Sequence, residues 1–162
     1  MARGKVSTPA TAALSAAGVA FTVRSYEHDP AATSYGLEAA HALGAAPAEV
    51  FKTLLASADG RPVVAVVPVS GQLDLKALAV AVGAKRAELA EPRLAERTTG
   101  YVVGGISPLG QRRALPTVVD SSALEHPSVL VSGGRRGLDI ELSPADLIRL
   151  TEATTARIGR PA

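Results

Sequence analysis

The sequence contains no cysteine, and this absence removes several kinds of chemistry at once. A chain without thiols forms no disulfides, binds no metal through thiolates and offers no cysteine nucleophile. The three histidines, His28, His41 and His126, are far apart and match no metal-ligand spacing. We therefore expect no metal site and no reaction that depends on a thiol of the protein.

Aromatic residues are scarce as well, at 3% of the 162 residues, whereas hydrophobic residues reach 47%. The core must therefore consist mainly of Ala, Val, Leu and Ile, and the length fits a single domain over residues 1–162. No apolar run approaches the roughly 18 residues of a transmembrane helix. Residues 10–21 follow Arg3 and Lys5 as in a signal peptide, but polar residues and Gly18 interrupt the run. We interpret this segment as an amphipathic helix and expect a cytoplasmic protein without a membrane partner.

Sequence patterns of several enzyme classes are missing too. The glycine patterns that bind nucleotide phosphates do not occur, so we expect no nucleotide cofactor. Gly105, Ser107 and Gly110 come within one residue of a nucleophile elbow, but Pro108 cannot donate the backbone N–H that its oxyanion hole needs. Carboxylates occur singly, which gives a two-carboxylate mechanism no specific support. Ser107 is therefore not assigned as a nucleophile.

Local patterns predict interleaved helices and strands. Caps, prolines and stop glycines predict helices over residues 7–17, 35–43, 75–82, 92–97 and 143–158. Apolar and β-branched runs predict strands over residues 21–26, 50–57, 63–69, 101–103, 118–120, 129–132 and 138–142, with a hairpin turn at 59–62. This order predicts an α+β fold, with a mixed, partly barrel-like sheet and helices packed around it.

Residues 100–111 join a short apolar segment to a glycine-rich loop. Glycine has no Cβ and lets a ligand approach the backbone, while Pro108 limits the freedom of the loop. A tight hairpin turn is the alternative, but the glycines and the proline exceed what such a turn needs. The N–H groups of Gly104 and Gly105 are therefore candidate donors to an oxygen that becomes negative during acyl transfer.

Lys52 lies within the apolar run 50–55, where strand alternation places it on one face with Val50 and Leu54. A lysine that protects an edge strand from aggregation is one explanation. The other is a desolvated ammonium group that lines a pocket and binds an anionic or carbonyl-bearing ligand. The sequence favours neither.

Thirteen of the seventeen cationic residues are arginine, although the net charge is only +2. Contacts with nucleic acid would therefore depend on local patches. Arg112-Arg113 and Arg135-Arg136 are the clearest patches, and each adjoins a glycine-rich loop. Solvated hairpin ends would explain both pairs as well.

Five ordered blocks of sequence resemble the bacterial Cys-tRNA(Pro) deacylase family, the YbaK/EbsC type. They are residues 26–30, 50–54, 71–76, 100–111 and 131–141, and the resemblance extends from about residue 8 to 158. The wider superfamily includes the editing domain of bacterial prolyl-tRNA synthetases and free-standing Ala-tRNA(Pro) deacylases.

The resemblance implies hydrolysis in trans of mischarged Cys-tRNA(Pro), and also of Cys-tRNA(Cys), by a monomer without cofactors. Cysteine and proline are close in size, and a pocket separates ligands that differ by one methylene by only about 1 to 3 kcal/mol. In the family the substrate thiol attacks its own carbonyl while backbone donors hold the oxyanion. The implied partners are tRNA(Pro) carrying cysteine and prolyl-tRNA synthetase. An Ala-tRNA(Pro) deacylase and a non-catalytic tRNA-binding module are the alternatives.

The resemblance also implies roles for individual residues. Lys52 matches an essential lysine that positions the tRNA end or the aminoacyl group, and Gly104 matches the donor to the carbonyl oxygen. Other positions match the substrate pocket: Tyr26, Tyr35, Thr53, Ser132 and Asp139. Tyr35 is a departure, since members often carry phenylalanine there. Core packing is the alternative for Tyr26 and Tyr101, and for Asp139 it is the satisfaction of nearby backbone amides.

Overall fold

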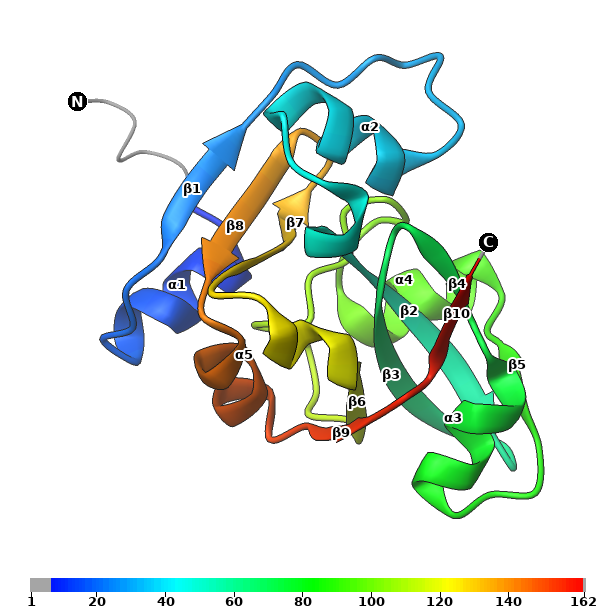
Figure 1. Cartoon of the computed structure of the whole chain (residues 1–162). Helices are drawn as coiled ribbons and strands as arrows, with labels where there is room; N and C mark the ends of the chain where they lie inside the picture. The colour runs from blue at the N-terminus through cyan, green and yellow to red at the C-terminus, as the bar shows by residue number, and fades with distance from the viewer. Residues whose placement is uncertain (1–6, 162) are drawn as a thin grey trace.

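Strands and helices alternate along the part of the chain that the structure, a computed structural model, describes, residues 7–161 (Figure 1). The strands are β1 (Thr22–Ser25), β2 (Phe51–Ala58), β3 (Arg61–Pro68), β4 (Gly71–Leu73), β5 (Ala87–Leu89), β6 (Thr117–Asp120), β7 (Val129–Arg135), β8 (Leu138–Leu142), β9 (Thr154–Ala156) and β10 (Gly159–Pro161). The helices are α1 (Pro9–Ala16), α2 (Tyr35–Leu43), α3 (Leu75–Val82), α4 (Pro92–Thr99) and α5 (Pro144–Thr151), with short 3₁₀ helices η2 (Pro47–Glu49) and η3 (Ser121–Glu125). Arg3 and Lys5, part of the N-terminal pattern considered above, lie outside the described residues.

The described strands form three sheets. The largest has the order β5-β2-β3-β6-β9, in which β3-β6 and β6-β9 are parallel and the other pairs antiparallel. A second sheet has the order β1-β8-β7, and β10 pairs with β4 in a third. The predicted α+β class with a mixed sheet is confirmed. The partly barrel-like sheet is resolved into separate open sheets, and one isolated parallel bridge between Val50 and Leu130 connects the two larger ones.

The five-stranded sheet has an apolar layer on each face. Along β3, Val64 and Val66 pack into one buried cluster with residues of α1, α4 and α5. The alternate residues Val63 and Val67 pack into a second cluster with Leu78 of α3. Side chains of a strand point alternately to opposite faces, so a central strand covered on both faces is apolar throughout. In Figure 1, α4 lies behind β2 and β3, whereas α3 lies at the lower end of these strands, near β5.

Most of the predicted turns and caps are present. The β2-β3 hairpin turns at Asp59 and Gly60, both with positive φ, as a two-residue hairpin loop requires. Thr8 caps α1 with Pro9 at the first helical position, and Asp74 caps α3. Gly44 and Gly83 end their helices in the left-handed conformation, as predicted. These signals are local, so they act wherever the rest of the chain lies.

Two predicted elements are wrong. The segment 101–103 is a turn and not a strand, because α4 ends at Gly100 and Gly105 N–H bonds back to Val102 O at 2.8 Å. The last helix ends at Thr151 and not near residue 158, because Glu152 adopts a left-handed conformation with φ 52°. The chain then forms β9 against β6, where backbone hydrogen bonds replace those of a continued helix.

Among the helices of residues 7–161, none combines the length and the apolar character that crossing a membrane requires.

Asp120 connects the end of β6 to the C-terminal strands. Its Oδ1 accepts from the N–H groups of Ile158 and Gly159 at 2.8 and 2.7 Å. Its Oδ2 accepts from the N–H and hydroxyl of Ser122 at 3.2 and 2.5 Å. Burial opposes ionisation of this carboxyl, but the donors from Ser122, Gly159 and Ile158 outweigh burial and lower its pKa below 3.8. The ionised side chain therefore stabilises the fold.

Asp120→Ala is expected to lower the free energy of unfolding by about 1 to 3 kcal/mol at about pH 7, because buried N–H groups lose their acceptor. A carboxyl with a lowered pKa stabilises the fold above its unfolded pKa and loses this effect as the pH falls through the folded pKa. The difference between wild type and variant should therefore shrink below about pH 4. Urea unfolding at several pH values measures this difference in the free energy of unfolding. Glu125→Ala, which removes an exposed carboxylate of η3, is the control. A difference of equal size at acid pH would contradict this role.

Candidate functional site

A cavity of about 360 Å³ lies beside the first half of β2, within the size range of ligand pockets. Its lining comes from β2, the start of α2, the segment from β5 into α4, the glycine-rich loop after α4, and the ends of β1, β7 and β8. Most of these residues are apolar, among them Phe51, Leu55, Leu89, Ala95 and Ile106. A few polar groups interrupt this apolar lining. Such a lining suits a small ligand that is positioned by few polar contacts.

The cavity lies where one edge of β2 has no neighbouring strand. β3 pairs with β2 along its whole length, but β5 pairs only with Ala56 to Ala58. At the start of β2, the contact with the three-stranded sheet is a bridge at Val50. Residues 51–54 therefore have no strand partner on this edge, and all four line the cavity. A ligand here would meet side chains of β2 and its unpaired backbone edge.

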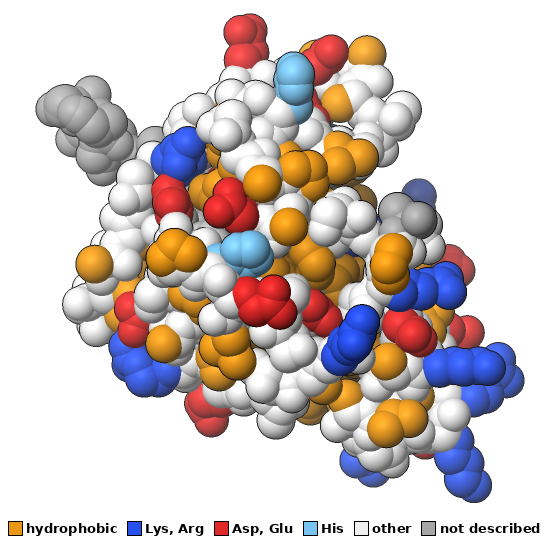
Figure 2. Space-filling model, viewed as in Figure 1, with side chains coloured by type: hydrophobic (Ala, Val, Ile, Leu, Met, Phe, Trp, Pro, Cys, Tyr) orange, Lys and Arg blue, Asp and Glu red, His pale blue; other side chains and the backbone are white. Residues whose placement is uncertain are grey.

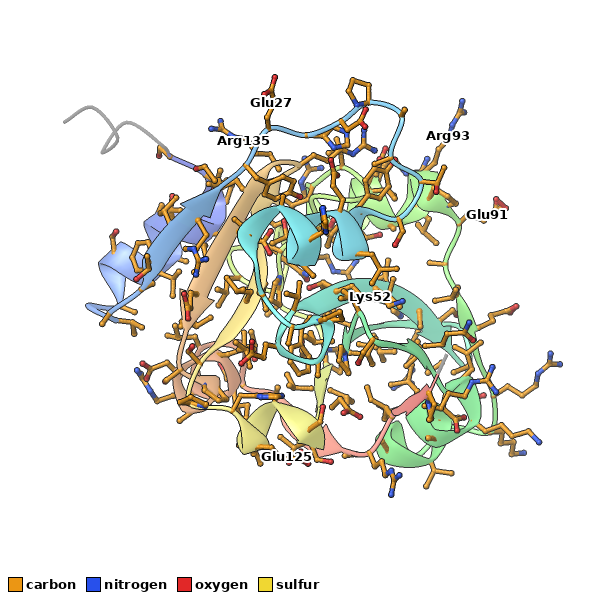
Figure 3. All side chains as sticks on the ribbon, turned by 45° about the horizontal axis from the view of Figure 1, so that its top comes forward. Glu27, Lys52, Glu91, Arg93, Glu125 and Arg135 are labelled. Carbon is orange, nitrogen blue, oxygen red and sulfur yellow. The ribbon has the colours of Figure 1, made fainter. Side chains whose placement is uncertain are left out.

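Lys52 projects into this gap. Its side chain is half-buried, and burial lowers the pKa of its ammonium group. Within residues 7–161 no carboxylate lies at ion-pair distance from it. In Figure 3, Lys52 lies beside α2, well inside the outline of the molecule, whereas Arg93 and Glu91 project outward from the start of α4. Lys52 thus lies on an open strand edge that forms the wall of a pocket, an arrangement compatible with either explanation given above.

The neighbouring Thr53 is buried, and its hydroxyl has no hydrogen-bond partner among the described residues. A buried hydroxyl without a partner costs about 1 to 3 kcal/mol. Thr53 also lines the cavity, so its hydroxyl is a candidate to bind a ligand there.

Three predicted pocket residues come from the three-stranded sheet. Ser132 of β7 stands opposite Asp139 of β8 in the register, and Tyr26 follows β1, with its N–H bonded to Gly137 O at 2.9 Å. All three line the cavity. Burial and then the Asp139 charge raise the pKa of Tyr26. Core packing of Tyr26 and a pocket role are thus compatible, since its ring also packs against a buried cluster.

Asp139 is buried, and burial raises its pKa to about 7 although the charge of Arg24 acts in the opposite direction. Arg24 is engaged elsewhere, with Glu141 at 2.7 Å and the Leu43 carbonyl at 3.1 Å. No described backbone N–H donates to the Asp139 carboxyl, so the alternative that it satisfies backbone amides is wrong. The cavity therefore contains an acid that ionises near neutral pH.

The glycine-rich loop contributes Val103, Gly104 and Ile106 to the cavity. Gly104 has φ 88°, and a Cβ here would lie 2.7 Å from the Tyr35 ring. The structure contradicts the prediction that the Gly105 N–H is also a free donor, since it is bonded to Val102 O. Gly105 instead allows close packing, because its Cβ would lie 2.7 Å from the Arg135 backbone. Sequence cannot separate two adjacent glycines, whose roles depend on the direction of each peptide plane.

Ser107 and Tyr101 hold the rest of this loop together. Ser107 is fully buried, with its hydroxyl accepting from Leu109 N–H at 3.2 Å and its carbonyl accepting from the Gln111 amide at 2.9 Å. The Tyr101 hydroxyl donates to Leu109 O at 2.7 Å. Core packing, the alternative kept open for Tyr101, is confirmed.

The four arginines predicted to bind tRNA do not form one patch around the cavity. Arg136 lies over the Tyr35 ring, 4.5 Å from its centroid, and Arg135 is exposed on the same hairpin, near the edge of the molecule in Figure 3. Arg112 packs beside Gly100, and Arg113 borders a separate, smaller depression. The cavity is lined by none of the four.

Cationic side chains gather elsewhere on one face. Figure 2 shows them on the side formed by α3, β5 and β10, interspersed with acidic ones. Exposed members of this region are Lys76, Lys85, Arg86 and Arg160. Lys85 and Arg86 are adjacent in the sequence, but Lys76 and Arg160 are distant from them, so no local pattern indicates that the four belong to one region. The apolar lining at Leu89, Pro92 and Ala95 escaped sequence analysis for a similar reason, since no local pattern indicates which apolar residues border a cavity.

No group of three or more potential metal ligands occurs among residues 7–161.

Comparison with known proteins adds independent findings. Residues 28–150 match the sequence profile of the family described as "Aminoacyl-tRNA editing domain". The chain is 41% identical, over 120 residues, to EbsC of Enterococcus faecalis (strain ATCC 700802 / V583), a candidate Cys-tRNA(Pro)/Cys-tRNA(Cys) deacylase. This alignment covers 74% of the chain and 73% of that protein.

Solved structures share the fold. The crystal structure of a candidate trans-editing enzyme for prolyl-tRNA synthetase matches with a TM-score of 0.81 and 27% identity, covering 96% of this chain and 99% of that one. The crystal structure of the hypothetical protein APE2540 matches with a TM-score of 0.85 and 27% identity, covering 94% of this chain and 100% of that one.

The raised pKa of Asp139 predicts an unusual dependence of stability on pH. A carboxyl that ionises less readily when folded makes the folded state bind more protons, so stability falls as the pH rises from about 4 to about 7. Asp139→Asn should remove this loss and raise the free energy of unfolding at about pH 8 by roughly 1 to 4 kcal/mol, since a tenfold change in proton affinity corresponds to about 1.4 kcal/mol. Urea unfolding at about pH 5 and about pH 8 tests this. A variant no more stable than wild type at the higher pH would show that Asp139 ionises normally.

Proposed function

The chain belongs to the aminoacyl-tRNA editing domain family, and on this premise we propose that it hydrolyses mischarged Cys-tRNA(Pro) in trans. One observation carries the proposal. A cavity of about 360 Å³ is lined by a half-buried lysine without an acidic partner and by Gly104, whose N–H donates to no described residue. Such a site binds an anionic or polarised oxygen without supplying a nucleophile.

The roles of the protein follow from what each group can donate or accept. Lys52, as a cation in a partly desolvated site, would hold the tRNA end or the aminoacyl group. The Gly104 N–H would donate to the carbonyl oxygen as it becomes negative, and the Thr53 hydroxyl would gain a partner. A substrate ammonium group near Asp139 would favour the ionised carboxylate, because an opposite charge lowers the pKa of an acid.

The nucleophile would come from the substrate. No histidine lines the cavity, and the Ser132 hydroxyl accepts from Gly134 N–H at 3.2 Å. In the proposed step the cysteinyl sulfur forms a bond to its own carbonyl carbon as the ester bond to the tRNA oxygen breaks. The thiol proton ends on the released tRNA hydroxyl, and water then opens the cyclic thioester.

Partners follow from the substrate. A mischarged tRNA(Pro) is the product of prolyl-tRNA synthetase in the cytoplasm, so this synthetase is the candidate partner. A solved relative with a TM-score of 0.81 is described as a trans-editing enzyme for that synthetase, which supports the same assignment. We expect the protein to act as a monomer, as the family resemblance implies.

A deacylation panel tests the proposed function. Cys-tRNA(Pro) should be hydrolysed at least roughly tenfold faster than Ala-tRNA(Pro), since alanine has no side-chain nucleophile. Ser-tRNA(Pro) should also react slowly, because a hydroxyl is a much weaker nucleophile than a thiolate near neutral pH. The rate with cysteine should rise with pH as the thiolate fraction grows. Faster loss of alanine than of cysteine would overturn the assignment, and equal rates for serine and cysteine would indicate attack by water.

Lys52→Ala is expected to lower kcat/KM for Cys-tRNA(Pro) by at least about 100-fold, because the site loses its charged donor. The free energy of unfolding should not fall, since a partly desolvated ammonium group is removed. Lys76→Ala, which removes an exposed lysine of α3, is the matched control and should remain close to wild type. Single-turnover deacylation and urea unfolding measure the two effects. Full activity of the Lys52 variant would rule out the proposed site.

A further inference from the structure

The peptide group between Val103 and Gly104 is held by a charged side chain. Arg136 Nε and Nη2 donate to the Val103 carbonyl oxygen at 2.9 and 2.6 Å. The C=O and N–H of a trans peptide point in opposite directions, and no cis peptide occurs in the described chain. The Gly104 N–H therefore points away from the Arg136 guanidinium.

The neighbouring N–H groups are already occupied. Val103 N–H donates to Glu96 Oε2 at 2.8 Å, and Gly105 N–H donates to Val102 O at 2.8 Å. Among residues 103–105, only the Gly104 N–H lacks an acceptor within the described chain. Glu96 thus holds the peptide group before Val103, and Arg136 holds the one after it. With both planes fixed, the direction of the free donor is determined by two ionic side chains.

Arg136 is itself fixed in place. Its guanidinium lies 4.5 Å from the centroid of the Tyr35 ring. The centroids of the Tyr35 and His28 rings are 5.9 Å apart. His28 in turn pairs with Glu38 of α2 at 2.8 Å. No described carboxylate forms an ion pair with Arg136. The Nε and Nη2 groups of Arg136 donate instead to the neutral carbonyl of Val103. A contact with an aromatic ring combined with two N–H donors to one carbonyl oxygen is a geometry that arginine provides and lysine does not.

We infer that Arg136 is a positioning residue, which orients and polarises the Val103–Gly104 peptide so that its N–H stabilises the oxyanion. This inference rests on the proposed function, in which that N–H receives the substrate carbonyl. A charged donor on the carbonyl strengthens the opposite N–H as a donor, because hydrogen bonds in series polarise one another. Arg136 then acts through Gly104, in addition to the contribution to tRNA binding that its position in a basic pair suggested.

Two neighbouring variants separate these roles. Arg135→Gln and Arg136→Gln each remove one cation from the same hairpin, so both should weaken tRNA binding and raise KM to a similar degree. Only Arg136→Gln should also lower kcat, by about 10- to 100-fold, as expected when an oxyanion donor is misplaced. Arg136→Lys keeps the charge without the two parallel donors and should lose most of the same kcat. Equal kcat values for all three variants and wild type would overturn the inference and leave Arg136 as a tRNA contact.

A second measurement needs no tRNA. In ¹H–¹⁵N spectra of the free protein, Arg136→Gln and Arg136→Lys should shift the Gly104 amide signal, whereas Arg135→Gln should leave it in place. An unmoved Gly104 signal in folded Arg136 variants would refute the coupling. Thermal melts establish folding, and Arg136→Lys carries the test if the glutamine variant unfolds. Absence of deacylation in the wild type would overturn the proposed function, while the amide shift would still decide whether Arg136 controls this peptide group.

Discussion

The incomplete pairing of one edge of β2 is the constraint on which the site depends. β5 covers only the end of this strand, and the three-stranded sheet meets it by a bridge at Val50. Between these contacts the structure must close the gap with side chains from α2, α4 and the glycine-rich loop, and it does so incompletely. A cavity results. A fully paired β2 would have placed Lys52 against another strand.

Polar groups without protein partners distinguish this cavity from an ordinary packing defect. Lys52 has no carboxylate at ion-pair distance, Thr53 has an unsatisfied hydroxyl, and the Gly104 N–H lacks an acceptor in the described chain. Thr53 and Lys52 lower the stability of the free protein, because desolvated polar groups are costly without partners. The loop around Gly104 is nevertheless held firmly by Glu96 and Arg136. Rigid support around unsatisfied donors is the arrangement expected of a preorganised binding site.

Much of the fold could be predicted because its signals are local. The caps at Thr8 and Asp74, the hairpin at Asp59 and Gly60 and the apolar run of β3 act within a few residues. The errors occurred where tertiary pairing overrode a local pattern. Residues 154–156 join β6 as an edge strand, although the preceding helical pattern continues into them, and Tyr101 serves as a buried core residue instead of starting a strand.

The sequence by itself determined the family resemblance, the lack of thiol chemistry and most of the polar pocket residues, because motifs and composition are properties of the chain. Only the tertiary structure decided that Gly104 and not Gly105 offers a free N–H, that Arg136 donates to the Val103 carbonyl while Arg112 packs beside Gly100, and that Asp139 is buried without a backbone donor. Peptide orientation, the partners of a side chain and its burial depend on segments far apart in the sequence. Their effects on donor availability and pKa therefore arise only when those segments meet.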